Sequence, residues 1–203
     1  MEIELKRIAY NPRLDENAFA ANLFIAGEKA ATVNNRNGST QYFPVNERGM
    51  ELVTEAEEFL KKLPTEKKMV EGQEKTIKQT LTTQIEKLFA NHIESIEQQK
   101  FNKKVELLQK RNIVFGVPGK YQRTHLMATP IDVLALSPGG QALISEAISK
   151  KIKPVMLEME QILNTNIPKN VLIETLGESV QETRQEQVIK ETKVQKKNTG
   201  VKL

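Results

Sequence analysis

Residues 19–33, FAANLFIAGEKAATV, predict a β-hairpin around which the N-terminal part of the chain is built. The apolar run 19–25 has the composition of a buried strand. Gly27 follows it and favours a tight turn, and residues 30–33 supply a second short apolar run. We therefore expect two antiparallel strands joined at the glycine.

Further strands are expected on either side of this hairpin. Ile3, Leu5 and Ile8 alternate with charged residues, close to the two-residue period of a half-buried strand. After an asparagine-rich loop over residues 34–38, residues 41–43 form another short strand. Together these segments predict a small antiparallel sheet.

A helix is expected to cover the sheet. Asn46 is a good N-cap residue, and Pro64 stops the periodic run that follows it. The apolar residues of this run recur at helical spacing: Met50, Val53, Ala56, Phe59, Leu60 and Leu63. Residues 1–64 are therefore predicted to form one unit, a β-sheet with a helix.

The longest periodic stretch of the chain covers residues 77–108, after a polar connector over residues 65–75. Its apolar residues keep steps of three to five: Ile77, Leu81, Ile85, Leu88, Phe89, Ile93, Ile96, Phe101, Val105 and Leu108. This pattern predicts one amphipathic helix of about ten turns, or two helices joined near Lys100.

A second hairpin is predicted after this helix. Residues 113–117 are a β run, and residues 121–127 form the returning strand. Pro118 followed by Gly119 prefers a type II turn, whose twist does not suit a two-residue hairpin, so we expect a longer loop.

Two helix starts follow in quick succession. Thr129 and Ser137 each place a capping side chain before a proline. The first helix is brief, residues 131–136, and the second extends over residues 139–163 with a kink or split at Pro154.

The end of the chain has a different composition. From Gly177 onward there are few apolar residues and many Gln, Glu and Lys, a composition typical of disorder. Residues 65–176 are predicted to form a helical unit with a β-hairpin, and residues 177–203 a disordered basic tail. The fold class is therefore predicted as α+β: a small antiparallel sheet with a covering helix, then a long amphipathic helix, a β-hairpin, C-terminal helices and the tail.

The composition indicates the cellular compartment in which the protein resides. The chain of 203 residues has no cysteine, which excludes disulfides and thiolate zinc sites. The N-terminus alternates charged and apolar residues, unlike a signal peptide, and no apolar stretch approaches the roughly 20 residues that span a bilayer. We expect a soluble cytoplasmic protein without a membrane partner.

The net charge of +4 lies in the tail. Between Lys190 and Lys202 five lysines stand against Glu191 alone, which gives +4, so the rest of the chain sums to zero. The folded part is therefore dipolar, with an acidic helix over residues 47–63 and a basic stretch over residues 100–125.

Several strings resemble a family of small uncharacterised proteins encoded by bacteria and their phages or mobile elements. They are NAFAANLFIAGEKA (17–30), NNRNGSTQY (34–42), EAEEFLKKLP (55–64), NIVFGVPGKY (112–121) and ILNTNIP (162–168). The resemblance covers roughly residues 1–168 and excludes the tail. It implies a biological setting and no reaction, since none of these strings carries known chemistry.

Residues suited to catalysis are scarce. The only aspartates are Asp15 and Asp132, and the only histidines are His92 and His125, so neither an aspartate-based nuclease nor a metal cage is favoured. The glycines never meet the spacing of a phosphate-binding loop. We therefore predict a protein that is not an enzyme and that holds no cofactor or metal.

One binding signal is a patch of cations near the second hairpin. Its predicted nucleic-acid-binding residues are Lys100, Lys103, Lys104, Lys110, Arg111, Lys120 and Arg123. Such a surface suits a phosphate backbone, but it also suits a solvated face that balances the acidic helix.

Two functions follow as hypotheses. The first is a nucleic-acid-associated accessory protein of a phage or mobile element, which contacts phosphates through the patch and the tail without base specificity. The second is a protein-interaction module, such as a virion component or an inhibitor of a host factor. In that case the stripe over residues 77–108 would self-associate, like a coiled coil, or dock a partner.

Removing the tail is expected to leave the fold intact. A chain truncated after Leu176 should keep its melting temperature nearly unchanged. The removed residues lack the apolar surface to offset an ordering cost of roughly 1–2 kcal/mol per residue. Thermal unfolding of both chains checks this, and a drop of many degrees would show that the tail packs.

Overall fold

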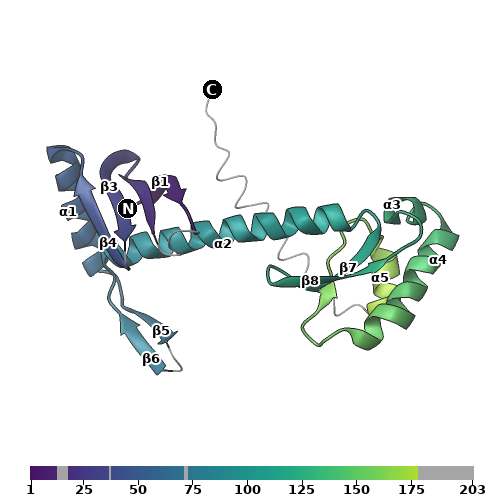
Figure 1. Ribbon diagram of the computed structural model, residues 1–203. Helices are drawn as coiled ribbons and strands as arrows, with labels where there is room; N and C mark the ends of the chain where they lie inside the picture. Colours follow the sequence, from purple (N-terminus) through teal and green to yellow (C-terminus); the bar gives the residue numbers. More distant parts are fainter. Residues whose placement is uncertain (13–17, 37, 71–72, 178–203) are drawn as a thin grey trace. The chain divides into compact units, whose positions relative to one another are not determined.

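The computed structural model describes residues 1–12, 18–36, 38–70 and 73–177, and it confirms an α+β fold (Figure 1). Contacts divide the chain into two compact units, residues 1–96 and 97–203. Each unit has its own hydrophobic core. Of the predicted disordered tail, only Gly177 belongs to the described residues.

The first unit contains the predicted sheet. Strands β1 (Ile3–Tyr10), β2 (Phe19–Ile25), β3 (Glu28–Arg36) and β4 (Ser39–Pro44) are antiparallel and adjacent in chain order. Ala26 and Gly27 join β2 to β3 with φ values of 51° and 84°. Positive φ at both positions defines a type I′ turn, whose twist matches the strands. The hairpin predicted over residues 19–33 is confirmed.

Strand β1, at one edge of the sheet, is not regular along its length. Its pairing with β2 shifts between Lys6 and Ala9, and Arg7 there has a φ of 54°. An inserted residue of this kind is a β-bulge, which bends and twists the strand locally.

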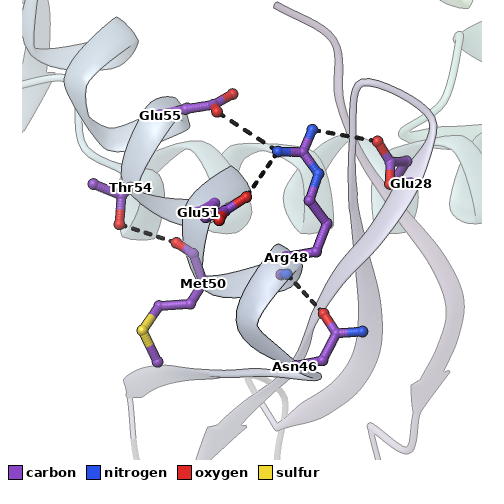
Figure 2. Close-up of polar contacts among 8 residues, drawn as sticks. Glu28, Asn46, Arg48, Met50, Glu51, Thr54 and Glu55 are labelled. Atoms are coloured by element: carbon purple, nitrogen blue, oxygen red, sulfur yellow. Dashed lines mark hydrogen bonds and ion pairs between the residues drawn. The ribbon is translucent and has the colours of Figure 1, made fainter.

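Helix α1 (Glu47–Lys61) begins where Asn46 predicted. The Asn46 side chain accepts a hydrogen bond from the Gly49 N–H at 2.8 Å (Figure 2). The predicted buried face was wrong at Met50, which is 60% exposed, whereas Leu52 is buried. The reason is Gly49, which is buried against the backbone of β3. Because Gly49 faces the sheet, the next residue, Met50, lies on the exposed side of the helix.

The first core lies on one face of the sheet, under α1 and the beginning of α2 (Leu81–Leu108). The Phe89 ring of α2 stacks on Phe19 with centroids 4.0 Å apart and meets Tyr10 edge-on at 5.3 Å. The buried residues of this core are Phe19, Ala21, Leu23, Ile25, Ala30, Ala31, Val33, Leu52, Val53, Ala56, Leu60, Leu81, Ile85 and Phe89.

The connector predicted over residues 65–75 contains a second small sheet. Strands β5 (Glu66–Val70) and β6 (Gln73–Ile77) pair as an antiparallel hairpin, so Ile77 ends a strand and does not begin the helix. This hairpin was not predicted, because its residues are mostly Glu, Lys, Gln and Thr, without an apolar alternation.

Helix α2 is continuous through Lys100, which excludes two helices joined there. It is shorter than predicted because it starts at Leu81, after Thr80 and Thr83 cap one another. Its first half belongs to the first core, so the contacts divide the chain at residues 96 and 97, whereas the sequence predicted a boundary at residues 64 and 65. Among the described residues, no helix combines the length and apolar character that crossing a membrane requires.

The second unit contains the predicted β-hairpin. Strands β7 (Asn112–Val117) and β8 (Tyr121–Leu126) pair antiparallel, and β9 (Gln161–Ile162) adds to the other side of β7. A three-residue loop separates Val117 from Tyr121, which confirms a connection longer than two residues.

The helices of the second unit begin near the predicted prolines. Helix α3 (Ile131–Leu134) starts after Pro130 without a side-chain cap, so the expected role of Thr129 was wrong. Helix α4 (Pro138–Ala147) is capped by Ser137, which accepts a hydrogen bond from the Gly140 N–H at 3.1 Å, as predicted. A further helix, α5 (Lys169–Leu176), was not predicted individually.

The second predicted helix does not reach residue 163. After α4 the chain passes through a π-helical turn (Ile148–Ile152) and a 3₁₀ turn (Lys153–Val155), then becomes extended. Pro154 explains the change, because its ring lacks an N–H and would clash with the carbonyl four residues earlier in an α-helix. The wider turn accommodates the ring, and the chain then leads to β9.

Gly49 offers a test of the packing between α1 and the sheet. A Cβ at this position would lie 2.3 Å from the Ala30 carbonyl oxygen. We expect Gly49→Ala to lower the free energy of unfolding by about 1–3 kcal/mol in urea titrations, because backbone cannot easily retreat. Gly139→Ala is the control, since nothing lies within 4 Å of its Cβ position. An equal loss in both variants would contradict this account.

Candidate nucleic-acid interface

All seven predicted cations belong to the second unit and are exposed. Lys100, Lys103 and Lys104 lie in the second half of α2. Lys110 and Arg111 connect α2 to β7, Lys120 lies in the β7–β8 loop, and Arg123 lies in β8.

The three helix lysines share one side of α2. Positions i, i+3 and i+4 lie next to one another on a helix, so their ammonium groups extend from the same surface. Leu107 continues this row and is 68% exposed. Val105, on the opposite side, is buried. We call Lys100, Lys103 and Lys104 the lysine row.

Lys120 does not join the lysine row. Its neighbour Gly119 is so close to α2 that an added Cβ would meet the Gln98 Oε1 atom at 2.5 Å. Gln98 in turn donates to Asn102 at 2.9 Å. At roughly 100° per residue, Gln98 and Asn102 lie on the side of α2 away from the lysine row.

Arg123 is bound within the protein. Its guanidinium donates to both carboxylate oxygens of Glu160, at 3.0 Å for Nε, and to the Val155 carbonyl oxygen at 2.7 Å. It also lies over the Phe115 ring, 4.7 Å from the centroid. These contacts hold residues 155–160, which precede β9, against β7 and β8.

The Glu160 side chain is fully buried. Burial alone would raise its pKa, but hydrogen bonds from Arg123, the Leu157 N–H and Tyr121 hold the pKa below its usual value. Desolvation, and then the hydrogen bond to the Glu160 carboxylate, raise the pKa of Tyr121. Glu160 was not predicted as a site residue, because nothing in the local sequence pattern links it to a residue of β8.

Arg111 also has an internal partner. Its guanidinium donates to the Ala128 carbonyl oxygen at 3.2 Å, which holds the chain after β8. Within the described part of the chain, the ammonium groups of the lysine row, Lys110 and Lys120 have no ion-pair or hydrogen-bond partner. The patch therefore separates into two bound arginines and five free lysines.

The ILNTNIP segment has a structural role. Buried Asn164 accepts from the Val114 N–H at 2.6 Å and donates to the Asn112 carbonyl oxygen at 3.0 Å, as a strand residue would. Thr165 exchanges hydrogen bonds with the Gln109 side chain. Asn166 donates to the Gln109 carbonyl oxygen at 3.1 Å and to Asp132 at 2.9 Å. This segment ties β7, the end of α2 and α3 together.

The remaining candidate residues are scattered. His92 is half-buried on α2 and His125 half-buried in β8, and Asp15 lies outside the described residues. Among the residues that the structure describes, no group of three or more metal-ligating side chains is brought together.

Comparisons of the chain with protein-family models, with curated proteins and with solved structures give no match. The resemblance to the bacterial and phage family therefore stays a prediction.

The Arg123–Glu160 pair predicts a pH-dependent contribution to stability. Folding lowers the pKa of Glu160. Its contribution to the free energy of unfolding is therefore fully present above the pKa of the unfolded state, near 4.3, and is lost as the pH falls through the lower pKa of the folded state. Glu160→Gln should cost about 1.5–3 kcal/mol at neutral pH, and the cost should shrink as the pH falls below about 4. Urea unfolding of both proteins across this range measures it.

Glu146→Gln is the matched control. Glu146 pairs with Lys150 at 2.8 Å, but both side chains are exposed, so its replacement should change little at any pH. A Glu160→Gln cost that stayed constant down to acid pH would show that shape, not charge, explains the effect.

Proposed function

We propose that this chain is a nucleic-acid-associated, non-enzymatic accessory protein that contacts the phosphate backbone without base specificity. The lysine row is the principal contact, and Lys110, Lys120 and the tail lysines extend it. That the protein is encoded by a phage or mobile element and acts in the cytoplasm is part of the proposal. The first of these rests on the sequence resemblance.

The observation that carries the proposal is a contrast between cations. Arg48 lies among three glutamates, with contacts of 3.5 Å to Glu28, 3.1 Å to Glu51 and 3.8 Å to Glu55 (Figure 2). Lys6 and Lys150 likewise have carboxylate partners at 2.9 Å and 2.8 Å. In the described part of the chain the lysine row has none.

Adjacent like charges without counterions are unfavourable. Lys100 and Lys104 are an i, i+4 pair of equal sign, which destabilises a helix by a few tenths of a kcal/mol, roughly the reverse of a salt-bridged pair. A polyanion would remove this cost and release its own counterions, so the arrangement favours phosphate binding. Arg111 and Arg123 contribute less to the proposed surface, because their guanidinium groups already bind within the unit.

A second candidate is the protein-interaction module. Large apolar side chains are exposed in the second unit: Leu107, Leu126, Val133, Leu136, Leu143, Val155, Leu157 and Met159. The stripe over residues 77–108 supports this candidate less than expected, because Leu81, Ile85, Phe89 and Val105 are buried within the protein.

Charge reversal of the lysine row tests the proposal. For the full chain, the logarithm of the affinity should fall with the logarithm of salt with a slope of about −2.7 or steeper for duplex DNA, since three or more phosphates are neutralised. Lys100→Glu, Lys103→Glu and Lys104→Glu together should weaken binding about tenfold or more at low salt, equally for all sequences, and flatten the slope. Fluorescence anisotropy of labelled DNA measures both.

The control variant carries Lys61→Glu, Lys62→Glu and Lys78→Glu. These lysines are also exposed, and the change in net charge is the same, but they lie in the first unit. Binding should persist in the control. Wild-type affinity in the lysine-row variant, or equal losses in both variants, would refute the proposed contact surface.

A further inference from the structure

The four-stranded sheet of the first unit has a second face, opposite its core. Strand register defines which side chains lie on it, because directly paired residues share a face. One row across the sheet contains Ala9, Ala20, Asn34 and Gln41, the next contains Lys6, Asn22, Thr32 and Phe43, and a third contains Glu4, Phe24 and Lys29. We call these residues the open face.

The open face is accessible because the helices lie on the other side. The alternate residues, such as Leu23 and Val33, pack with α1 and α2 in the core. On the open face, Phe43 is 51% exposed, Thr32 and Gln41 are exposed, and Asn22, Asn34 and Phe24 are half-buried.

The chemistry of this face suits a nucleic-acid strand. Phe43 offers an exposed ring, whereas the Phe24 ring is half-buried and is covered by the Lys6 ammonium, 4.5 Å from its centroid. Amide and hydroxyl groups lie between the two rings. Lys6 pairs with Glu4 at 2.9 Å, so its charge is already balanced. Lys29, and Arg36 two residues beyond Asn34 on the same side of β3, are exposed and give the face its complementarity to phosphate.

We propose that the open face binds single-stranded nucleic acid, with a base stacked on Phe43 and phosphates held by Lys29 and Arg36. This inference rests on the proposed function and adds a second surface to it. Base-aromatic stacking is tolerant of sequence, because every base has a π-face, so it agrees with binding that lacks base specificity.

A duplex does not fit this surface. Phe43 is the exposed ring of this face, so a base must present an uncovered face in order to stack on it. Bases stacked in a duplex are only about 3.4 Å apart and cover one another's faces. A strand whose bases are unstacked can place one of them on the Phe43 ring.

The chain has no tryptophan, so Phe43→Trp introduces a single fluorescent reporter on the open face. We expect a labelled single-stranded oligonucleotide, bound to the full chain at low salt, to quench this fluorescence. A duplex of the same sequence should quench it much less. Phe43→Leu, which keeps an apolar side chain without the ring, should weaken single-strand binding roughly 5- to 100-fold, and Phe43→Trp should retain it.

Met50→Trp provides the matched reporter. Met50 is 60% exposed, against 51% for Phe43, but it lies on α1, away from the open face. The fluorescence of Met50→Trp should therefore not change on binding. Two results would overturn the inference while leaving the lysine-row proposal in place. One is oligonucleotide binding, measured by anisotropy, that does not quench the tryptophan of Phe43→Trp. The other is unchanged affinity of Phe43→Leu. Absence of any oligonucleotide binding at low salt would overturn both.

Discussion

The second unit depends on how the carbonyl groups at the end of α2 and in the turn after it find hydrogen-bond partners. The end of an α-helix leaves its final C=O groups without partners inside the helix, and burying them unpaired would be costly. Here Asn112 donates to the carbonyl of Leu108, the last residue of α2. In the turn that follows, Asn166 donates to the Gln109 carbonyl, and the N–H groups of Ile131 and Met127 donate to the Lys110 and Arg111 carbonyls. The hydrogen bonds at this point thus position β7, the ILNTNIP segment and the start of α3 relative to the end of α2.

The same requirement explains why two asparagines recur in the ILNTNIP segment. Asn164 replaces a backbone pairing beside β7, and Asn166 reaches the helix end. A side-chain amide suits both tasks because it carries a donor and an acceptor. This distinctive segment of the sequence therefore has a structural role in the fold of the second unit.

Much of the fold could be predicted where local signals and tertiary packing agree. Gly27 and Asn46 marked a turn and a helix start correctly, because φ > 0 and N-capping are local requirements. The inward face of α1 was misjudged because a glycine contact with β3 is invisible to hydrophobic periodicity. The step of five from Ile96 to Phe101 coincides with the division between units and was an available signal.

The candidate site was less predictable. The sequence located the cations, but the partners of Arg123 are nonlocal, so its engagement with Glu160 needed the structure. The open face escaped notice for a related reason, because Phe24 and Phe43 come together only through the register of β2, β3 and β4.

The bulge at Arg7 has a consequence for how the sheet can meet other molecules. An exposed edge strand is ordinarily a template for another chain, and so a route to aggregation. The bend in β1 disrupts such a template on one side, and Pro44, which has no N–H to donate, ends β4 on the other. The sheet is thus poorly suited to growing sideways into fibrils or swapped dimers.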